Sequence, residues 1–135
     1  MKTISIVIPC YNEEENVEAL YEEIKRIFKE SLSSYKYELI YIDNDSEDKT
    51  RDIIRTLCAK DKGVKAIFNA RNFGQFNSPY YAMINSTGDA TMLMAADFQD
   101  PPSMIVKFVK AWEEGYKIAI GIKSSSKESA IMYHL

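Results

Sequence analysis

The sequence predicts an α/β fold in which a mostly parallel sheet carries helices on both faces. Short apolar runs rich in β-branched residues alternate along the chain with longer segments whose apolar residues recur at helical spacing. Such alternation is typical of parallel sheets, because a helix returns the chain to the edge where the next strand begins. A length of 135 residues, of which 46% are hydrophobic and 27% charged, suits one domain with one core.

The expected strands span residues 3–9, 37–43, 64–69, 89–95 and 116–122. Asn12 is the expected N-cap of the first helix, which presents a single apolar stripe. A second helix is expected over residues 47–61. Ser78 is expected to cap a short helix over 78–87, and Asp100 a last helix before the fifth strand.

The net charge of −3, from 17 basic and 20 acidic residues, argues against a nucleic-acid partner held by a basic surface. A small anionic ligand is still compatible, because a few backbone amides and a metal can hold one. No stretch approaches the roughly 20 apolar residues of a membrane span, and no signal peptide is evident. We therefore expect a cytoplasmic domain, in which Cys10 and Cys58 are small apolar residues without metal-ligand spacing.

Polar residues gather where four of the expected strands end. The four segments are PCYNEE (9–14), DNDSED (43–48), NARNFG (69–74) and AADFQDPP (95–102). The carboxyl ends of parallel strands meet at one edge of the sheet, and ligands bind in the crevice beyond that edge. The loops expected at the opposite edge show no such concentration, so the four segments are the candidate site.

Individual residues in these loops suit a nucleotide. Tyr11 offers a flat face for a base, and Glu13 offers acceptors near a helix N-terminus. The carboxylate of Asp43 can accept from the imide N–H of uracil or the N–H groups of guanine. Arg71 can bind phosphate through its fork of donors, and Gly74 permits an unusual backbone angle. Taken alone, each loop is equally compatible with ordinary turn and capping chemistry.

Asp97 and Gln99 are the candidate metal ligands. They are two residues apart and can point to one side of an extended segment. Mg²⁺ and Mn²⁺ prefer oxygen ligands and accept few from the protein when a diphosphate supplies the others. The alternative is that Asp97 and Asp100 only turn and cap the chain before the prolines. Together, the four loops favour a metal–nucleotide site.

The segments SIVIPCYNEEEN, ELIYIDNDSEDKT, NARNFGQ and ADFQDPP, in this order, resemble the family-2 glycosyltransferases. The resemblance covers about residues 3–123 and is strongest to the branch of dolichol-phosphate mannose synthase and bacterial polyprenyl-phosphate sugar transferases. It implies a Rossmann-like nucleotide-binding sandwich of the glycosyltransferase A type. It also implies a UDP- or GDP-sugar donor, a Mg²⁺ or Mn²⁺ cofactor and inverting transfer of a hexosyl-type sugar to an acceptor.

The resemblance also implies roles for individual residues. The nucleotide-binding residues would be Pro9, Tyr11, Glu13, Asp43, Arg71, Asn72, Gly74 and Lys123. The metal ligands would be Asp97 and Gln99, with Asp97 also the catalytic residue.

Two departures from the family pattern are evident. Ala95 stands where the family usually has the first aspartate of an Asp-x-Asp motif. The absence of this aspartate should weaken donor binding or change donor selectivity. Asn44 and Asp45 stand where many members have aspartate and glycine. We expect residues 1–123 to form the donor-binding domain, and 124–135 to form an amphipathic tail that continues in a longer parent protein.

An alcohol acceptor needs a general base, and no clear candidate follows Asp97. A lipid phosphate is already ionised, which favours a polyprenyl-phosphate acceptor in cell-envelope synthesis. A base that lies in a further part of a longer parent protein explains the absence equally well, so a glycan acceptor stays open. With a polyprenyl-phosphate acceptor, the parent protein would act at the cytoplasmic face of a membrane, through its C-terminal part. Homo-oligomerisation stays open.

Two other classes of protein were weighed. A non-catalytic nucleotide-binding or assembly module with a degenerate metal motif would explain Ala95 and the short chain. A receiver-like signalling domain would require an aspartate after the third strand, where this chain has Asn69.

Overall fold

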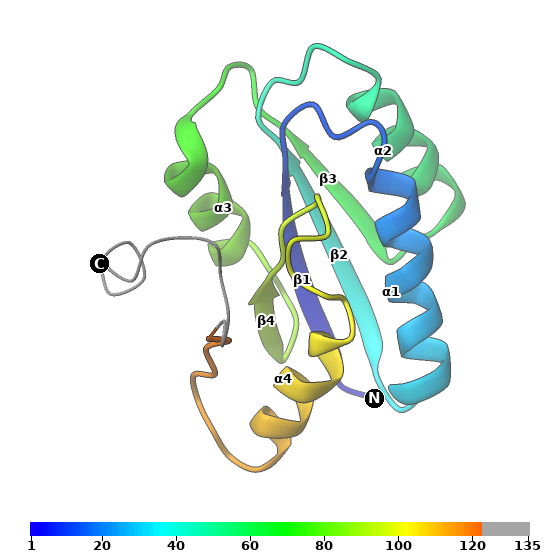
Figure 1. Ribbon diagram of the computed structural model, residues 1–135, viewed down its shortest axis with the longest axis vertical. Coiled ribbons are helices and arrows are strands. Elements are labelled where there is room, and N and C mark those ends of the chain that lie inside the picture. Colours follow the sequence, from blue (N-terminus) through cyan, green and yellow to red (C-terminus); the bar gives the residue numbers. More distant parts are fainter. Residues whose placement is uncertain (123–135) are drawn as a thin grey trace.

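The computed structural model describes residues 1–122. Its elements in chain order are β1 (Thr3–Cys10), α1 (Val17–Ser31), β2 (Lys36–Asp43), α2 (Thr50–Lys60), β3 (Val64–Phe68), α3 (Gly74–Ile84), β4 (Ala90–Leu93) and α4 (Met104–Glu113). The four strands form one parallel sheet in the order β3-β2-β1-β4 (Figure 1). The predicted α/β class with a parallel sheet is confirmed.

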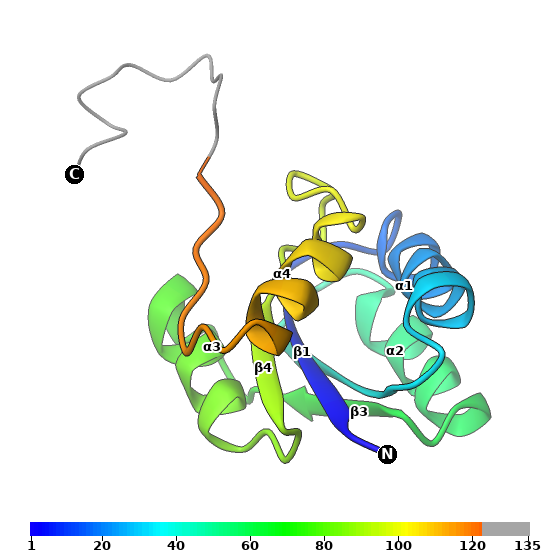
Figure 2. The ribbon, with the colours of Figure 1, turned by 90° about the horizontal axis from the view of Figure 1, so that it is seen from below.

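Helices cover both faces of the sheet, as predicted. Figure 2 shows α1, α2 and α4 on one side of the strands and α3 on the other. Successive side chains of a strand point to opposite faces, so Ile6 and Ile8 of β1 enter the larger core under α1, whereas Val7 packs with Ala82 of α3. The face with three helices therefore holds most of the apolar core.

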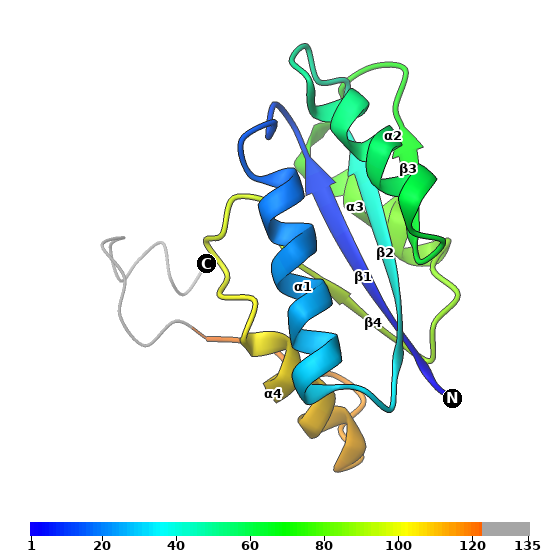
Figure 3. The same cartoon turned by 90° about the vertical axis from the view of Figure 1, so that its right-hand side faces the viewer.

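The register aligns the ends of three strands. Cys10 at the end of β1 lies opposite Asp43 at the end of β2, and Asp43 lies opposite Phe68 at the end of β3. Figure 3 shows β1, β2 and β3 side by side, running in the same direction. The loops that follow β1, β2 and β3 therefore leave the sheet at one level. The last residue of β4, Leu93, pairs with Val7, so the loop after β4 begins lower on the sheet.

The strand order also defines a switch point. The chain adds β2 and then β3 on one side of β1, and later places β4 on the other side. In open α/β sheets such a reversal leaves a crevice beyond the carboxyl ends of the two strands that flank it. Ligand binding is therefore expected next to the ends of β1 and β4.

The predicted strand over residues 116–122 is wrong. No strand is assigned there, and Ile118, Ile120 and Ile122 are each about four-fifths exposed. Alternating apolar residues indicate an extended segment, but a strand also needs a neighbour to pair with. Within residues 1–122 this segment has none.

Three predicted helix starts are also wrong. The first helix begins at Val17, the third at Gly74 and the last at Met104. The polar residues expected to cap them bind elsewhere or lie outside the first turn. Asn12, for example, has a φ of 51° and accepts the N–H of Glu47. A capping residue is recognised in sequence by type alone, whereas tertiary partners compete for the same side chain.

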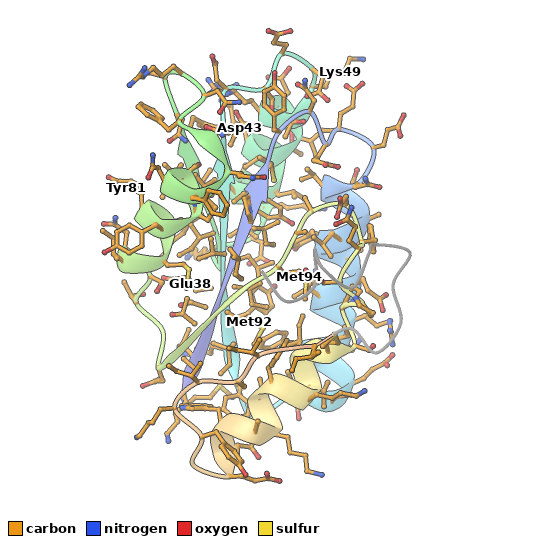
Figure 4. All side chains as sticks on the ribbon, turned by 60° about the vertical axis from the view of Figure 1, so that its left-hand side comes forward. Glu38, Asp43, Lys49, Tyr81, Met92 and Met94 are labelled. Carbon is orange, nitrogen blue, oxygen red and sulfur yellow. The ribbon has the colours of Figure 1, made fainter. Side chains whose placement is uncertain are left out.

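A buried glutamate joins the strands near the opposite edge of the sheet. Glu38 of β2 is 4% exposed (Figure 4). Its Oε1 accepts from Ser5 Oγ at 2.7 Å and Thr87 N at 2.9 Å, and its Oε2 accepts from Thr87 Oγ1 at 2.5 Å and from Lys65 Nζ. Gly88 N donates to Ser5 Oγ at 2.9 Å. This cluster ties β1, β2 and β3 to the turn that enters β4.

The surroundings of Glu38 keep it ionised. Burial alone would raise the pKa of Glu38, but hydrogen bonds from Lys65, Thr87 and Ser5 outweigh burial and lower the pKa to about 2. A carboxyl whose pKa is depressed on folding stabilises the native state above its unfolded pKa. That stabilisation is lost as the pH falls through the native pKa.

We predict that Glu38→Gln lowers the free energy of unfolding at neutral pH by about 2–3 kcal/mol, because the amide keeps only one acceptor oxygen and no longer carries the charge that pairs with Lys65. The wild type should lose the same stability as the pH falls from 4.5 towards about 2. Urea unfolding across this pH range measures both effects. The exposed Glu22→Gln on α1 is the control, and its unfolding midpoint should not change. Equal acid sensitivity of wild type and Glu38→Gln would contradict the assignment.

Candidate functional site

Asp43 lies at the centre of the aligned strand ends, and its side chain is fully buried. Its Oδ2 accepts from Ser46 N at 3.0 Å and from Arg51 Nε at 2.6 Å, and its Oδ1 accepts from Ser46 Oγ. Both oxygens are thus engaged by the chain itself, which fixes the turn after β2. A direct contact of Asp43 with a base stays a prediction.

Arg51, which sequence reasoning did not single out, holds this end of the sheet together. Its NH2 donates to the carbonyl of Asn69 and lies 3.6 Å from Asp45 Oδ1. Its guanidinium also lies 5.4 Å from the ring centre of Phe68. One side chain of α2 therefore joins the ends of β2 and β3. The sequence did contain one signal for Arg51: the helix dipole disfavours a cation in the first turn of a helix, so an arginine there suggests a partner elsewhere.

Side-chain hydrogen bonds join the loop after β1 to the loop after β2. Ser46 Oγ accepts from Asn12 N at 2.8 Å, and Asn12 Oδ1 accepts from Glu47 N at 2.9 Å. Thr50 Oγ1 accepts from Glu13 N at 2.9 Å. These contacts are reciprocal, because each loop supplies both donors and acceptors. The two loops therefore form one connected surface.

Asn44 joins the loop after β2 to the loop after β3. Its Nδ2 donates to Asn72 Oδ1 at 2.8 Å and to the carbonyl of Gly74 at 3.3 Å. Its Oδ1 accepts from Phe73 N at 2.8 Å and from Asn69 Nδ2 at 3.3 Å. Gly74 has a φ of 87°, so the unusual backbone angle predicted for this glycine is confirmed. We call residues 9–14, 43–50 and 69–74, which these contacts connect, the three-loop rim.

The exposed side chains of the rim are those best suited to meet a ligand. Tyr11 is 47% exposed, and Arg71 is exposed with its guanidinium 4.6 Å from the ring centre of Phe73. Pro9 and Glu13 are partly buried, and Glu13 Oε2 accepts from Asn16 Nδ2 at 3.0 Å. An aromatic face and a guanidinium are thus available at the rim.

The loop after β4 is held differently from the other three. Met94 and Ala96 anchor it in the main core, and Figure 1 shows it rising towards the end of the sheet where β1 finishes. Asp97 and Gln99 are exposed, and Asp97 Oδ1 accepts from Gln99 N at 3.2 Å. Among the described residues, no hydrogen bond or salt bridge joins 95–102 to the three-loop rim. Lys123 and the tail expected over 124–135 lie outside the described residues.

The donor set suits a hard cation only in part. One exposed carboxylate and one amide oxygen are ligands that Mg²⁺ and Mn²⁺ accept. Within residues 1–122, no group of three His, Cys, Asp or Glu side chains could hold a metal. The protein therefore supplies two candidate oxygens, and the other ligands would have to come from a bound diphosphate and water.

Cys10 is not a candidate nucleophile. Burial raises the pKa of its thiol, and the nearby carboxylate of Asp43 raises it further. Burial likewise raises the pKa of Cys58. Both thiols are free, and neither has the depressed pKa of a reactive cysteine.

Sequence comparison identifies relatives along nearly the whole chain. The family model for glycosyl transferase family 2 matches residues 5–131. An undecaprenyl-phosphate 4-deoxy-4-formamido-L-arabinose transferase from Serratia proteamaculans is 34% identical over 131 residues, which are 96% of this chain and 39% of the relative. A bactoprenol glucosyl transferase of Shigella phage SfX is 31% identical over 121 residues, covering 90% of this chain and 39% of the relative. The chain thus spans about two fifths of the length of these relatives.

Solved structures of similar fold contain nucleotides. A mannosyltransferase from Pyrobaculum calidifontis, in complex with GDP-Man and Mn²⁺, aligns with a TM-score of 0.67 and 20% identity, over 79% of this chain and 31% of that one. S. aureus TarS in complex with UDP aligns with a TM-score of 0.63 and 17% identity, over 93% of this chain and 40% of that one. These likenesses establish the glycosyltransferase A fold.

In residues 1–122, no helix is both long and apolar enough to cross a bilayer.

We predict that Arg51→Met lowers the free energy of unfolding by about 3 kcal/mol, the low end for breaking a buried pair, because Asp43 loses its cation but keeps the donor Ser46 N. Arg55→Met is the matched control. Arg55 also lies over Phe68, at 4.8 Å, but its carboxylate partner Asp52 is exposed. Urea unfolding should therefore show a much smaller change for Arg55→Met. Equal losses would show that stacking on Phe68, and not the Asp43 pair, accounts for the effect.

Proposed function

Because this chain belongs to glycosyl transferase family 2, we propose that it forms the donor-binding part of a glycosyltransferase that uses a nucleoside-diphosphate sugar. The observation that carries the proposal is the three-loop rim, whose exposed Tyr11 and Arg71 stand at the aligned ends of the parallel strands. The chain spans about two fifths of its relatives. Transfer activity, acceptor and partners are therefore proposed for the whole protein.

The donor would be a UDP- or GDP-sugar. Tyr11 would stack on the base, beside Pro9 and Glu13, and the turn after Asp43 would meet the edge of the base. Arg71, which lies next to Asn72 and Gly74, would bind phosphate through its planar fork of donors. Lys123 is proposed to lie near the diphosphate. UDP and GDP-Man in structures of similar fold support this donor class.

A divalent cation, Mg²⁺ or Mn²⁺, is proposed as the cofactor, held by Asp97 and Gln99. When bound, it would supply positive charge to the diphosphate that leaves during transfer. The negative charge of the neighbouring loops supports the proposal of a cation. Acidic residues dominate the loops after β1 and β2, and such a surface disfavours a dianion unless cations are also present.

The acceptor proposed for the whole protein is a polyprenyl phosphate. Two relatives are, by name, a bactoprenol glucosyl transferase and an undecaprenyl-phosphate transferase. An ionised phosphate oxygen can attack the anomeric carbon without a general base. Arg71 would stabilise the charge that develops on the leaving group. We propose that the whole protein works in cell-envelope synthesis at the cytoplasmic face of a membrane.

A second candidate function is a nucleotide-binding or assembly module that transfers no sugar. Ala95, in place of the first aspartate of the family motif, favours it. A decayed module would show no metal-dependent donor complex, and an assembly module would bind no nucleotide at all. Stabilisation by a nucleoside diphosphate with Mn²⁺ therefore favours the first candidate, and a flat response favours the second.

We predict that UDP or GDP with Mn²⁺ stabilises the protein by about 2–3 kcal/mol at a hundredfold excess over the dissociation constant. Asp97→Ala should abolish the Mn²⁺-dependent part of this stabilisation, because the only carboxylate ligand is lost. Thermal unfolding and calorimetry measure both effects. Asp100→Ala, in the same loop, is the control and should bind as the wild type does. Unchanged Mn²⁺ dependence in Asp97→Ala would remove the metal role of this residue.

We further predict that Ala95→Asp raises the affinity for a UDP- or GDP-sugar by about tenfold, since it adds a charge-assisted hydrogen bond to the ribose or sugar side of the donor. Ala95→Asn fills similar space without the charge and should give a smaller gain. Calorimetry with Mn²⁺ present measures the difference. An unchanged dissociation constant for Ala95→Asp would count against the idea that the lost carboxylate limits donor binding.

A further inference from the structure

We propose that Asn44 is a positioning residue that holds Arg71 where it can bind the donor diphosphate. The inference rests on the proposed function, because it concerns the same nucleotide. Asn44 stands where many family members have an aspartate, and its side chain reaches the loop that carries Arg71. Its role is therefore indirect and acts through residues 69–74.

The backbone of Asn44 gives its side chain a fixed base. Asn44 N donates to the carbonyl of Cys10 at 2.9 Å, which continues the pairing of β1 with β2. Next to it, the carbonyl of Asp43 accepts from Asn69 N at 2.9 Å. The residue thus stands between the ends of β1 and β3. A side chain at this point can fix the loop after β3 relative to the sheet.

The contacts of Asn44 require an amide. Its Nδ2 donates to two oxygens, on Asn72 and Gly74, while its Oδ1 accepts from two nitrogens, on Phe73 and Asn69. A carboxylate can replace only the acceptor half, and it would place negative charge beside the oxygens of Asn72 and Gly74.

Asn72 cannot compensate for a carboxylate at position 44 by rotating its own amide. Its Oδ1 also accepts from Gly74 N at 2.8 Å, and rotation would break this bond. Asn44 and Asn72 are therefore matched to each other, and an aspartate at position 44 does not suit this loop.

Arg71 depends on this arrangement through its neighbours. Asn69 and Asn72, on either side of it in the sequence, both bond to the Asn44 amide. Phe73, whose ring centre lies 4.6 Å from the Arg71 guanidinium, has its N–H held by Asn44 Oδ1. Removing the amide would release the backbone of Phe73, whose ring contacts the Arg71 guanidinium. Phosphate binding would weaken, whereas base stacking on Tyr11 would not.

The test compares Asn44→Ala, Asn44→Asp, Arg71→Ala and the double variant Asn44→Ala/Arg71→Ala. Calorimetry with Mn²⁺ gives their affinities for UDP, GDP and the phosphate-free nucleosides uridine and guanosine. Asn44→Ala should lose about tenfold in diphosphate affinity, the worth of one charge-assisted contact, and Asn44→Asp should lose more. Nucleoside affinity should not change. The double variant should bind no more weakly than Arg71→Ala, because the same contact is lost.

Asn85→Ala is the control, since Asn85 Nδ2 donates to the carbonyl of Tyr81 at the far end of α3. If Asn44→Ala does not fold, Asn44→Asp, which keeps the acceptor for Phe73 N, carries the test and should lose diphosphate affinity at unchanged nucleoside affinity. Losses that add in the double variant, or equal losses for nucleosides and diphosphates, would overturn the positioning role while the wild type still binds. A wild type that binds neither diphosphate would overturn the proposed function itself, and this inference with it.

Discussion

The charge pair between Asp43 and Arg51 is the interaction on which the candidate site depends. A fully buried carboxylate is costly unless donors surround it, and here Arg51 and Ser46 supply them. Because Arg51 also binds the carbonyl of Asn69, the pair joins α2 to the ends of β2 and β3. In the turn after β2, Ser46 Oγ then accepts from Asn12 N in the loop after β1. Three loops far apart in the sequence acquire their positions from this one pair.

Strand β2 carries a buried carboxylate near each end, and the two have different consequences. Glu38, near the start, binds Ser5, Lys65 and Thr87. It fixes the strands relative to each other at the edge of the sheet opposite the three-loop rim. Asp43, at the end, fixes the loops that would surround a ligand. Side chains satisfy many polar groups of the rim, while Tyr11 and Arg71 are exposed and available for recognition. Rigidity and binding are thus assigned to different residues of the same loops.

The sequence predicted the layers, four of the strands and the polar loops after β1, β2 and β3 that hydrogen bonds join, because these follow from hydrophobic periodicity and parallel topology. The fourth polar loop, 95–102, was expected at the same rim, but no hydrogen bond among the described residues joins it to the other three. The sequence also predicted the unusual backbone of Gly74. It could not predict what depends on partners distant in the sequence. The strand expected over 116–122 has the right pattern, but within residues 1–122 it has no strand to pair with, and Asn12 binds another loop in place of capping a helix. Arg51 was missed for the same reason, and Asn44 was noted only as a departure from the family pattern, since only the fold brings their partners together.

The most direct measurement of the central claim is a titration of the isotope-labelled protein with UDP and with GDP in the presence of Mg²⁺, followed through its backbone amide resonances. If the rim holds a nucleoside diphosphate beside a cation, the largest shift changes will fall in residues 9–14, 43–50, 69–74 and 95–99. Changes confined to the opposite edge of the sheet, at residues 31–36, 59–63 and 86–89, would contradict the claim. So would a spectrum that neither nucleotide alters.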